Sequence, residues 1–229
     1  MKARITVVDN QTIVGYRISS GWADLQPVYF VMKFSRPFER FGTAINNNLL
    51  WGIKDARNAH TSEANIKGAA RFDTKEGEKI LVKVGISTTS IDNARENLEA
   101  EISGWNFEGV KKKASKEWEK QLSKIQVTGK QKDKEIFYTA LYHSMVTPNQ
   151  IADVDGSFIG PDDKLDKAPN GKYYSTFSLW DTYRAAHPLY TLLIPNKVSD
   201  MINTMLLHYK KWGYLPIWTL WGQETHVMI

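Results

Sequence analysis

The first ninety residues alternate between short runs of β-branched and aromatic side chains and clusters of turn-forming residues. Runs of this kind, bounded by Gly, Pro, Asn or Asp, are typical of β-strands. The runs are Ile5–Val8, Thr12–Ser19, Val28–Phe34, Ala69–Phe72 and Ile80–Ile86. We therefore expect an antiparallel sheet or sandwich, with the third strand bounded by Pro27 and Pro37.

After Thr88 the apolar positions recur with a helical period. Thr89 or Ser90 can cap a first helix that continues to Ile102 and is stopped by Gly104. A second helix carries one apolar stripe on a lysine-rich rod. The stripe consists of Val110, Ala114, Trp118, Leu122 and Ile125. We expect this rod to be a linker helix that lies across a domain surface.

Beyond the lysine-rich region the pattern predicts helical hairpins. A helix from Ile136 to Val146 ends before Pro148, because proline lacks the N–H that a helix interior needs. An acidic loop rich in Gly and Pro follows over residues 153–171, and a short strand is expected at Tyr173–Phe177.

Two further helices are predicted near the end of the chain. One covers Leu179–Leu193, with Ser178 as its N-cap and Pro188 close enough to its middle to kink or divide it. The other begins at Pro195, where proline is favoured, and is stopped by Gly213. The last residues, 225–229, run apolar without a cap, and we expect the chain to continue the element beyond them.

Composition indicates a globular protein, since 42% of the 229 residues are hydrophobic and 24% are charged. The absence of cysteine excludes disulfides, thiolate zinc sites and cysteine nucleophiles. The net charge of +5 is local: residues 111–134 hold nine lysines against three acidic residues. This segment has no arginine and one aromatic residue, Trp118, so it predicts a solvated helix face and not a nucleic-acid surface. No apolar run approaches the ~18 residues of a membrane span, and the first residues lack the apolar region of a signal peptide.

One acidic loop allows a calcium interpretation. Asp153-Val154-Asp155-Gly156 places carboxylates at alternate positions before a glycine, and Asp162-Asp163 follows within reach. The spacing differs from that of an EF-hand, and Asx turns explain such loops without a metal, so the structural interpretation is favoured. The five histidines form no zinc-binding pair, and no nucleophile elbow, P-loop or dinucleotide motif occurs.

Aromatic and acidic residues cluster in two segments, 173–184 and 212–224. Sugars are bound by such mixtures, because rings cover the C–H faces while carboxylates and Arg bridge hydroxyl groups. Aromatic clusters at helix ends also form ordinary hydrophobic core, and composition alone leaves both interpretations open.

At these two segments the sequence closely resembles glycoside hydrolase family 92. The motifs that carry the resemblance are Tyr173-Tyr174-Ser175-Thr176-Phe177-Ser178-Leu179-Trp180-Asp181-Thr182-Tyr183-Arg184, His187-Pro188-Leu189, Gly213-Tyr214-Leu215-Pro216 and Trp221-Gly222-Gln223-Glu224-Thr225. Gly21-Trp22 and Val28-Tyr29-Phe30 fit as well, so the resemblance spans essentially the whole chain.

The resemblance implies a calcium-dependent, inverting, exo-acting α-mannosidase. The implied fold class is α+β: a β-sandwich portion over 1–88, linker helices over 89–130, and the beginning of an (α/α)6 catalytic toroid over 131–229. Family members are much longer, so the chain is expected to be an internal portion of an enzyme. The resemblance also implies a periplasmic or cell-surface location.

The resemblance assigns substrate-binding roles and leaves the catalytic residues elsewhere. Asp181 and Trp180 are expected to bind the terminal mannose; the alternative for Asp181 is a carboxylate favoured by the dipole at a helix N-terminus. Trp221 and Glu224 are expected to line the same pocket with Arg184, or Glu224 forms a buried ion pair with Arg184. The general acid, the general base and the Ca²⁺ ligands are expected beyond Ile229, so that no catalytic residue or metal ligand is assigned in this chain.

Two other functions stay open at this stage. The chain could be a stand-alone, non-catalytic carbohydrate-binding module for α-mannoside glycans. It could also be an inactive piece that does not fold stably, in which case exposed apolar helix faces would lead to aggregation.

Overall fold

The structure is a computed structural model that describes residues 2–58 and 65–224. The chain divides into two compact units, one formed by Met1–Trp105 with Ala152–Phe158 and the other by Asn106–Ile151 with Ile159–Ile229. The expectation about the apolar residues 225–229 lies outside the described residues. The domain boundaries expected from the sequence, at residues 88 and 130, stay a prediction.

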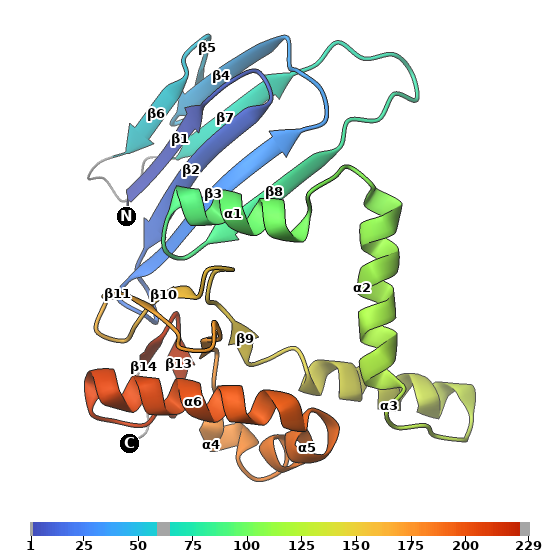
Figure 1. Ribbon diagram of the computed structural model, residues 1–229. Coiled ribbons are helices and arrows are strands. Elements are labelled where there is room, and N and C mark those ends of the chain that lie inside the picture. Colours follow the sequence, from blue (N-terminus) through green and yellow to red (C-terminus); the bar gives the residue numbers. More distant parts are fainter. Residues whose placement is uncertain (1, 59–64, 225–229) are drawn as a thin grey trace. The chain divides into compact units, whose positions relative to one another are not determined.

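Antiparallel strands make up most of the first unit (Figure 1). They are β1 (Lys2–Val7), β2 (Thr12–Ser19), β3 (Gln26–Phe34), β4 (Arg40–Ile45), β5 (Asn48–Trp51), β6 (Asp55–Asn58), β7 (Ile66–Arg71) and β8 (Val82–Ser87). A five-stranded sheet has the order β6-β1-β2-β3-β8, and a three-stranded sheet has the order β5-β4-β7. The five strands predicted from the sequence are confirmed, while β4, β5 and β6 were not predicted.

Proline at the start of β3 is compatible with a central strand. β3 pairs with β2 from Gln26 onward, but its pairing with β8 begins only at Tyr29. Pro27 therefore removes no hydrogen bond from the β3–β8 ladder, although its ring nitrogen cannot donate one.

The five-stranded sheet is covered on both faces because neighbouring residues of a strand point to opposite sides. Ile13 of β2 belongs to a cluster that joins the two sheets, and Val14 belongs to a cluster beneath the first helix. The buried members of the first cluster are Val7, Ile13, Phe34 and Phe38, with Phe41 and Ala70 of the smaller sheet packed against them. This packing of sheet on sheet is a β-sandwich.

Helix α1 (Ile91–Glu101) packs against β3 and β8 of the same unit. It begins as predicted at Ser90, whose side chain accepts a hydrogen bond from the backbone N–H of Asn93 at 2.9 Å. Ala94 and Leu98 are its buried residues, and Gly85 of β8 lies directly beneath them. A Cβ atom on Gly85 would lie 2.2 Å from the carbonyl oxygen of Ala94, so the close approach of helix and sheet requires glycine.

Helices dominate the second unit. They are α2 (Phe107–Leu122), α3 (Gln131–Ser144), α4 (Leu179–Thr182), α5 (Ala186–Leu193) and α6 (Pro195–Trp212). Short strands accompany them: β9 (Asn149–Gln150), β11 (Leu165–Lys167), β12 (Tyr174–Ser175), β13 (Thr219–Leu220) and β14 (Gln223–Glu224). Strand β10 (Ser157–Ile159) begins in the first unit and ends at Ile159, which belongs to the second. No residue of α2 is buried, which fits the predicted lysine-rich rod.

The helix predicted over Leu179–Leu193 is divided, but not at Pro188. The break covers residues 183–185, between α4 and α5, and Pro188 lies in the first turn of α5. A first-turn N–H has no partner within its helix, so proline is tolerated there. The other predicted helix is confirmed, since Pro195 is the first residue of α6 and Gly213 closes it with φ of 86°.

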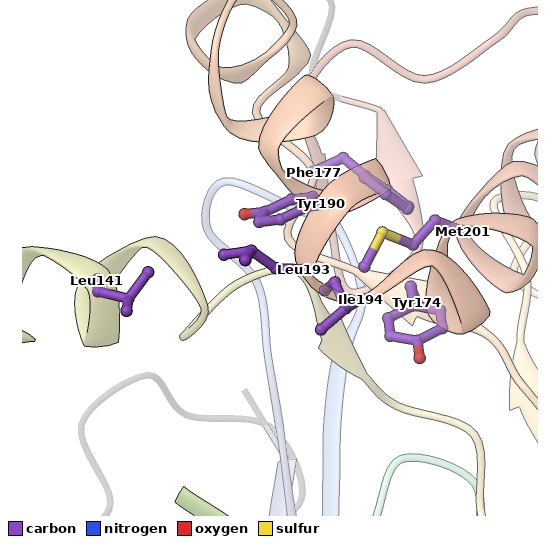
Figure 2. Packing of buried hydrophobic residues seen from close by; sticks show 7 residues of the cluster. All are labelled: Leu141, Tyr174, Phe177, Tyr190, Leu193, Ile194 and Met201. Carbon is purple, nitrogen blue, oxygen red and sulfur yellow. The ribbon is translucent and has the colours of Figure 1, made fainter. Parts of the chain in front are cut away.

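A hydrophobic cluster packs helices α3, α5 and α6 of the second unit together (Figure 2). Its buried members are Leu141, Tyr174, Phe177, Tyr190, Leu193, Ile194 and Met201. The hydroxyl of Tyr190 donates to the carbonyl oxygens of Ser144 and Thr147, at 2.6 and 3.0 Å, and thereby ties α5 to the end of α3. No described helix combines the length and the apolar character that crossing a membrane would require.

Candidate functional site

The two aromatic and acidic segments lie side by side in the second unit. The N–H of Leu179 donates to the carbonyl of Ile217 at 2.8 Å, and the N–H of Thr219 donates to the carbonyl of Phe177 at 3.2 Å. Ser178 and Trp218 form an antiparallel bridge between these two bonds. The start of α4 and the segment that leads into the final hairpin are thus fixed to each other by backbone contacts.

The final hairpin turns at Trp221 and Gly222. β13 and β14 pair antiparallel, with Thr219 opposite Glu224, and both turn residues have positive φ, 55° and 82°. Positive φ at both central positions defines a type I′ turn, which favours glycine or asparagine. A bulky residue in the left-handed region is held there by the surrounding structure and marks a candidate functional position. Trp221 is such a residue, and its side chain is partly exposed.

Glu224 is buried, with 7% of its surface exposed, and binds backbone. Its carboxylate accepts hydrogen bonds from the N–H groups of Ile217 and Trp218, the latter at 2.9 and 3.0 Å to its two oxygens. The guanidinium group of Arg184 instead donates to the hydroxyl of Tyr183 at 3.2 Å and lies 5.6 Å from the centre of that ring. These contacts favour the interpretation of Glu224 as a structural carboxylate, and the contacts described for Arg184 are with Tyr183.

Asp181 is exposed and lies in the first turn of α4. Its Oδ2 atom accepts a hydrogen bond from the hydroxyl of Ser178 at 2.5 Å and a longer one from Nε1 of Trp218 at 3.4 Å. The indole N–H of Trp218 also donates to the hydroxyl oxygen of Ser178 at 2.9 Å. Oδ1 accepts no hydrogen bond from any residue within 2–58 or 65–224, so one carboxylate oxygen is available to an external donor.

The remaining predicted residues surround Asp181 in sequence and are open to solvent. The side chain of Trp180 is 57% exposed and that of Tyr183 is 57% exposed, and Arg184 is exposed as well. Exposed rings beside a carboxylate and a guanidinium group suit a polar ligand with apolar C–H faces, such as a sugar.

Ser178 and Trp218 are the residues of this site that sequence reasoning missed. Ser178 was predicted as an N-cap, but its side chain makes no capping bond and contacts Asp181 instead. Trp218 was one of several aromatic residues in its segment. The contact between Ser178 and Asp181 could have been predicted, because the two residues are three positions apart at the start of a helix. Nothing in the local sequence indicated the contact between Trp218 and Asp181.

The loop Asp153-Val154-Asp155-Gly156 is organised by hydrogen bonds within the first unit. Oδ2 of Asp153 accepts from Ser87, Thr89 and Asn93, and Oδ1 accepts from Nδ2 of Asn97 at 2.7 Å. Asp155 accepts from the N–H and the hydroxyl of Ser157 at 2.9 and 2.8 Å, which is an Asx turn.

These contacts leave Asp153 poorly suited to a metal. Its two oxygens are already occupied by four uncharged donors, and only 3% of its surface is exposed. Within the part of the chain that the structure describes, no group of three or more His, Cys, Asp or Glu residues could hold a metal ion. The residues of this loop therefore do not fit Ca²⁺, and no step is assigned to a metal here.

Burial perturbs two titratable groups next to the site. Desolvation lowers the pKa of His187, which lies 6.4 Å from the ring of Phe177 and 5.2 Å from that of Tyr190. Burial, and after it the charge of Asp162, raises the pKa of Tyr173 far above its usual value. Both groups are consequently neutral near pH 7.

Comparison with known proteins gives a consistent result. The model of the glycosyl hydrolase family 92 N-terminal domain matches residues 1–87, and that of the family 92 catalytic domain matches residues 93–229. A search of curated proteins finds no match.

Two solved structures are similar over almost the whole chain. The family 92 α-mannosidase BT3965 from Bacteroides thetaiotaomicron is 35% identical to this chain, with a TM-score of 0.91. The match covers 99% of this chain and 31% of the BT3965 chain. The inverting mannosidase BT2199 from the same species is 24% identical with a TM-score of 0.88, and 100% of this chain covers 31% of that one. The chain thus spans about a third of the length of these mannosidases.

The likeness confirms the expected fold class, α+β, with a β-sandwich portion followed by helices that correspond to the start of the toroid of these mannosidases. The family models together cover nearly all of the sequence, and the more similar structure is an α-mannosidase of the same family. The chain belongs to glycosyl hydrolase family 92.

Proposed function

We propose that this chain is part of an exo-α-mannosidase that removes terminal α-linked mannose from glycans by an inverting, calcium-dependent reaction. The proposal is carried by the 35% identity to an α-mannosidase over 99% of the chain. A structure of that relative in complex with mannoimidazole supports a mannose-like ligand for this family. An extracytoplasmic location, in the periplasm or at the cell surface, belongs to the same proposal.

In this proposal Asp181 binds the terminal mannose. Its free Oδ1 accepts hydrogen bonds from sugar hydroxyls, and Trp180 covers a C–H face of the ring. Arg184 and Trp221 complete the lining as weaker contributors. Glu224 contributes by holding the backbone of Ile217 and Trp218, and its buried, hydrogen-bonded carboxylate is not assigned as the general acid.

The chemical step requires groups that we assign to sequence beyond Ile229. An inverting glycosidase needs a general acid and a general base about 6.5–9.5 Å apart, with a water molecule between the base and the sugar. A bound calcium ion would supply coordination of the mannose hydroxyl groups and so favour a distorted sugar ring. The residues of this chain would orient the sugar and exclude water from one side of it.

Calorimetry tests the binding role on this chain. We expect weak binding of methyl α-mannoside that is lost in Asp181→Ala and is the same with calcium and with a chelator. Asp133→Ala is the matched control, because Asp133 is also an exposed carboxylate in the first turn of a helix. If both variants bind like the wild type, Asp181 is only a helix-terminal carboxylate and its binding role is wrong.

A non-catalytic carbohydrate-binding module is the second candidate. It is favoured by the open oxygen of Asp181 combined with the burial of Glu224, which leaves one exposed carboxylate in the two joined segments. Release of mannose from an α-mannoside by the whole protein, in the presence of calcium, would exclude this candidate. Tight binding without turnover under the same conditions would support it.

A further inference from the structure

A chain of hydrogen bonds connects the buried Glu224 to the exposed Asp181. Glu224 accepts from the backbone N–H of Trp218, the indole of Trp218 donates to Ser178 and Asp181, and Ser178 donates to Asp181. All of these residues belong to the second unit. This network of hydrogen bonds links two segments that are distant in sequence, since Trp218 and Asp181 are separated by 37 positions.

The direction of each hydrogen bond follows from the donors available. The indole Nε1–H can only donate, so the hydroxyl oxygen of Ser178 must accept from it at 2.9 Å. The single proton of Ser178 is then directed to Oδ2 of Asp181, 2.5 Å away. The network therefore has one arrangement of protons, in which Oδ2 accepts twice.

The backbone of Trp218 is itself held in place. Besides the two contacts with Glu224, the isolated bridge to Ser178 and the pairing of Thr219 with Glu224 fix the residues on either side. A carboxylate that accepts from two successive backbone N–H groups allows little rotation of that segment, because both bonds are charge-assisted. Glu224 thus fixes the backbone from which the indole of Trp218 extends.

We propose that Trp218 is a positioning residue for the mannoside subsite, which acts with Ser178 to hold Oδ2 of Asp181 so that only Oδ1 faces the sugar. This inference rests on the proposed function. An ordered carboxylate binds a ligand more tightly than a rotating one, because less side-chain freedom is lost on binding. Glu224 acts one step further back, through the backbone of Trp218.

The geometric part of the proposal is tested without any ligand. In protein labelled with ¹⁵N at tryptophan, Trp218→Phe identifies the indole N–H signal of Trp218 among those of the eight tryptophans. We expect that signal to move in Asp181→Ala and in Ser178→Ala, and to stay unchanged in Asp133→Ala. If the chemical shift of the Trp218 indole N–H is unchanged in both Asp181→Ala and Ser178→Ala, the proposal is overturned.

The functional part is tested by affinity for methyl α-mannoside. Trp218→Phe keeps an aromatic ring but removes the donor, so we expect a loss of affinity of about 2- to 12-fold, as for one ordinary hydrogen bond. Ser178→Ala should lose affinity and Ser178→Thr should restore it, while thermal unfolding of Trp218→Phe stays close to that of the wild type. Unchanged affinity in Trp218→Phe, combined with loss in Asp181→Ala, overturns the positioning role and leaves the proposed function intact.

Failure of the proposed function gives a different result. If the wild type binds no mannoside although the indole signal responds to Asp181→Ala and Ser178→Ala, the network exists but the mannoside assignment is wrong. The positioning role toward a sugar is then overturned together with that assignment.

Discussion

Asp153 is a buried carboxylate whose hydrogen-bond donors all come from uncharged side chains. Two hydroxyls and two amides surround it, from Ser87, Thr89, Asn93 and Asn97. Thr89 lies just before the N-cap of α1 and Asn93 lies in its first turn, where the helix dipole also favours a negative charge. The carboxylate thus anchors the segment 152–158 to the β-sandwich unit, which explains why this short segment belongs to the first unit.

Substitution of Asp153 should strongly destabilise the protein. Asp153→Ala leaves several buried donors without a partner, and we expect the free energy of unfolding to fall by about 2–4 kcal/mol. The measurement is urea denaturation. Asp73→Ala is the control, since Asp73 is exposed and forms one long ion pair, with 3.9 Å between its Oδ1 and Nε of Arg71. This substitution should change the free energy of unfolding by less than about 0.5 kcal/mol. Equal effects of the two substitutions would contradict the anchoring role.

His187 predicts a dependence of stability on pH. Burial lowers its pKa in the folded protein, whereas the unfolded chain takes up the proton near its ordinary value of about 6.5. Between the pKa of His187 in the folded state and its higher pKa in the unfolded state, the unfolded state therefore binds more protons. Neutral His187 contributes fully to stability above pH ~6.5, and this contribution is lost as the pH falls from there toward the pKa of the folded state.

Thermal unfolding can isolate this contribution. We expect Tm to fall between pH 7.5 and pH 5.5, and part of that fall to come from His187. His187→Phe keeps the contacts with Phe177 and Tyr190 and should remove this part of the decrease. An identical pH dependence in His187→Phe and the wild type would show that His187 does not contribute.

At the scale of elements, the packing of α1 on the sheet depends on one small residue. Gly85 lies in β8 with an ordinary strand conformation, so backbone freedom is not the reason for glycine there. The reason is space, because a methyl group would meet both the carbonyl of Ala94 and the Cβ of Leu98, at 2.2 and 2.5 Å. Neither a helix backbone nor a fully buried leucine can move away easily.

Gly85→Ala should separate α1 from β8. We expect a loss of about 3 kcal/mol in the free energy of unfolding, measured by urea denaturation. Gly104→Ala provides the control, since a Cβ at that position meets nothing within 4 Å. If Gly85→Ala is as stable as Gly104→Ala, the helix does not lie as close to the sheet as described.

The prediction of elements from sequence succeeded where the signal was local. The Ser90 cap, Pro195 and Gly213 each act through the backbone of their own helix, and the structure confirms all three. Strands β5 and β6 escaped prediction because they have only four residues each, and β4 because Gly42 and Ala44 weaken its strand pattern. Their pairing with one another, with β7 and with β1 defines them. The division of the helix at residues 183–185 was likewise placed at the wrong position, since a proline in a first turn causes no break.

At the scale of the whole molecule, two compact units combine sheet and helix in the order expected for the family. The motif residues gave the family, because a long match of aromatic and acidic residues is specific even without an alignment. They did not give the geometry of the site. Of the predicted residues, Asp181 and Glu224 are connected through Trp218, whereas Arg184 lies against its neighbour Tyr183.

The sequence by itself determined five strands of the first unit, the longer helices, several helix ends and the family, because those properties depend on neighbouring residues and on the motif as a whole. Only the tertiary structure decided which polar groups meet. Ser87 lies 66 positions from Asp153, and Trp218 lies 37 positions from Asp181. Hydrogen bonds over such separations depend on how sheets and helices pack, and the packing is set by the buried apolar residues of each unit.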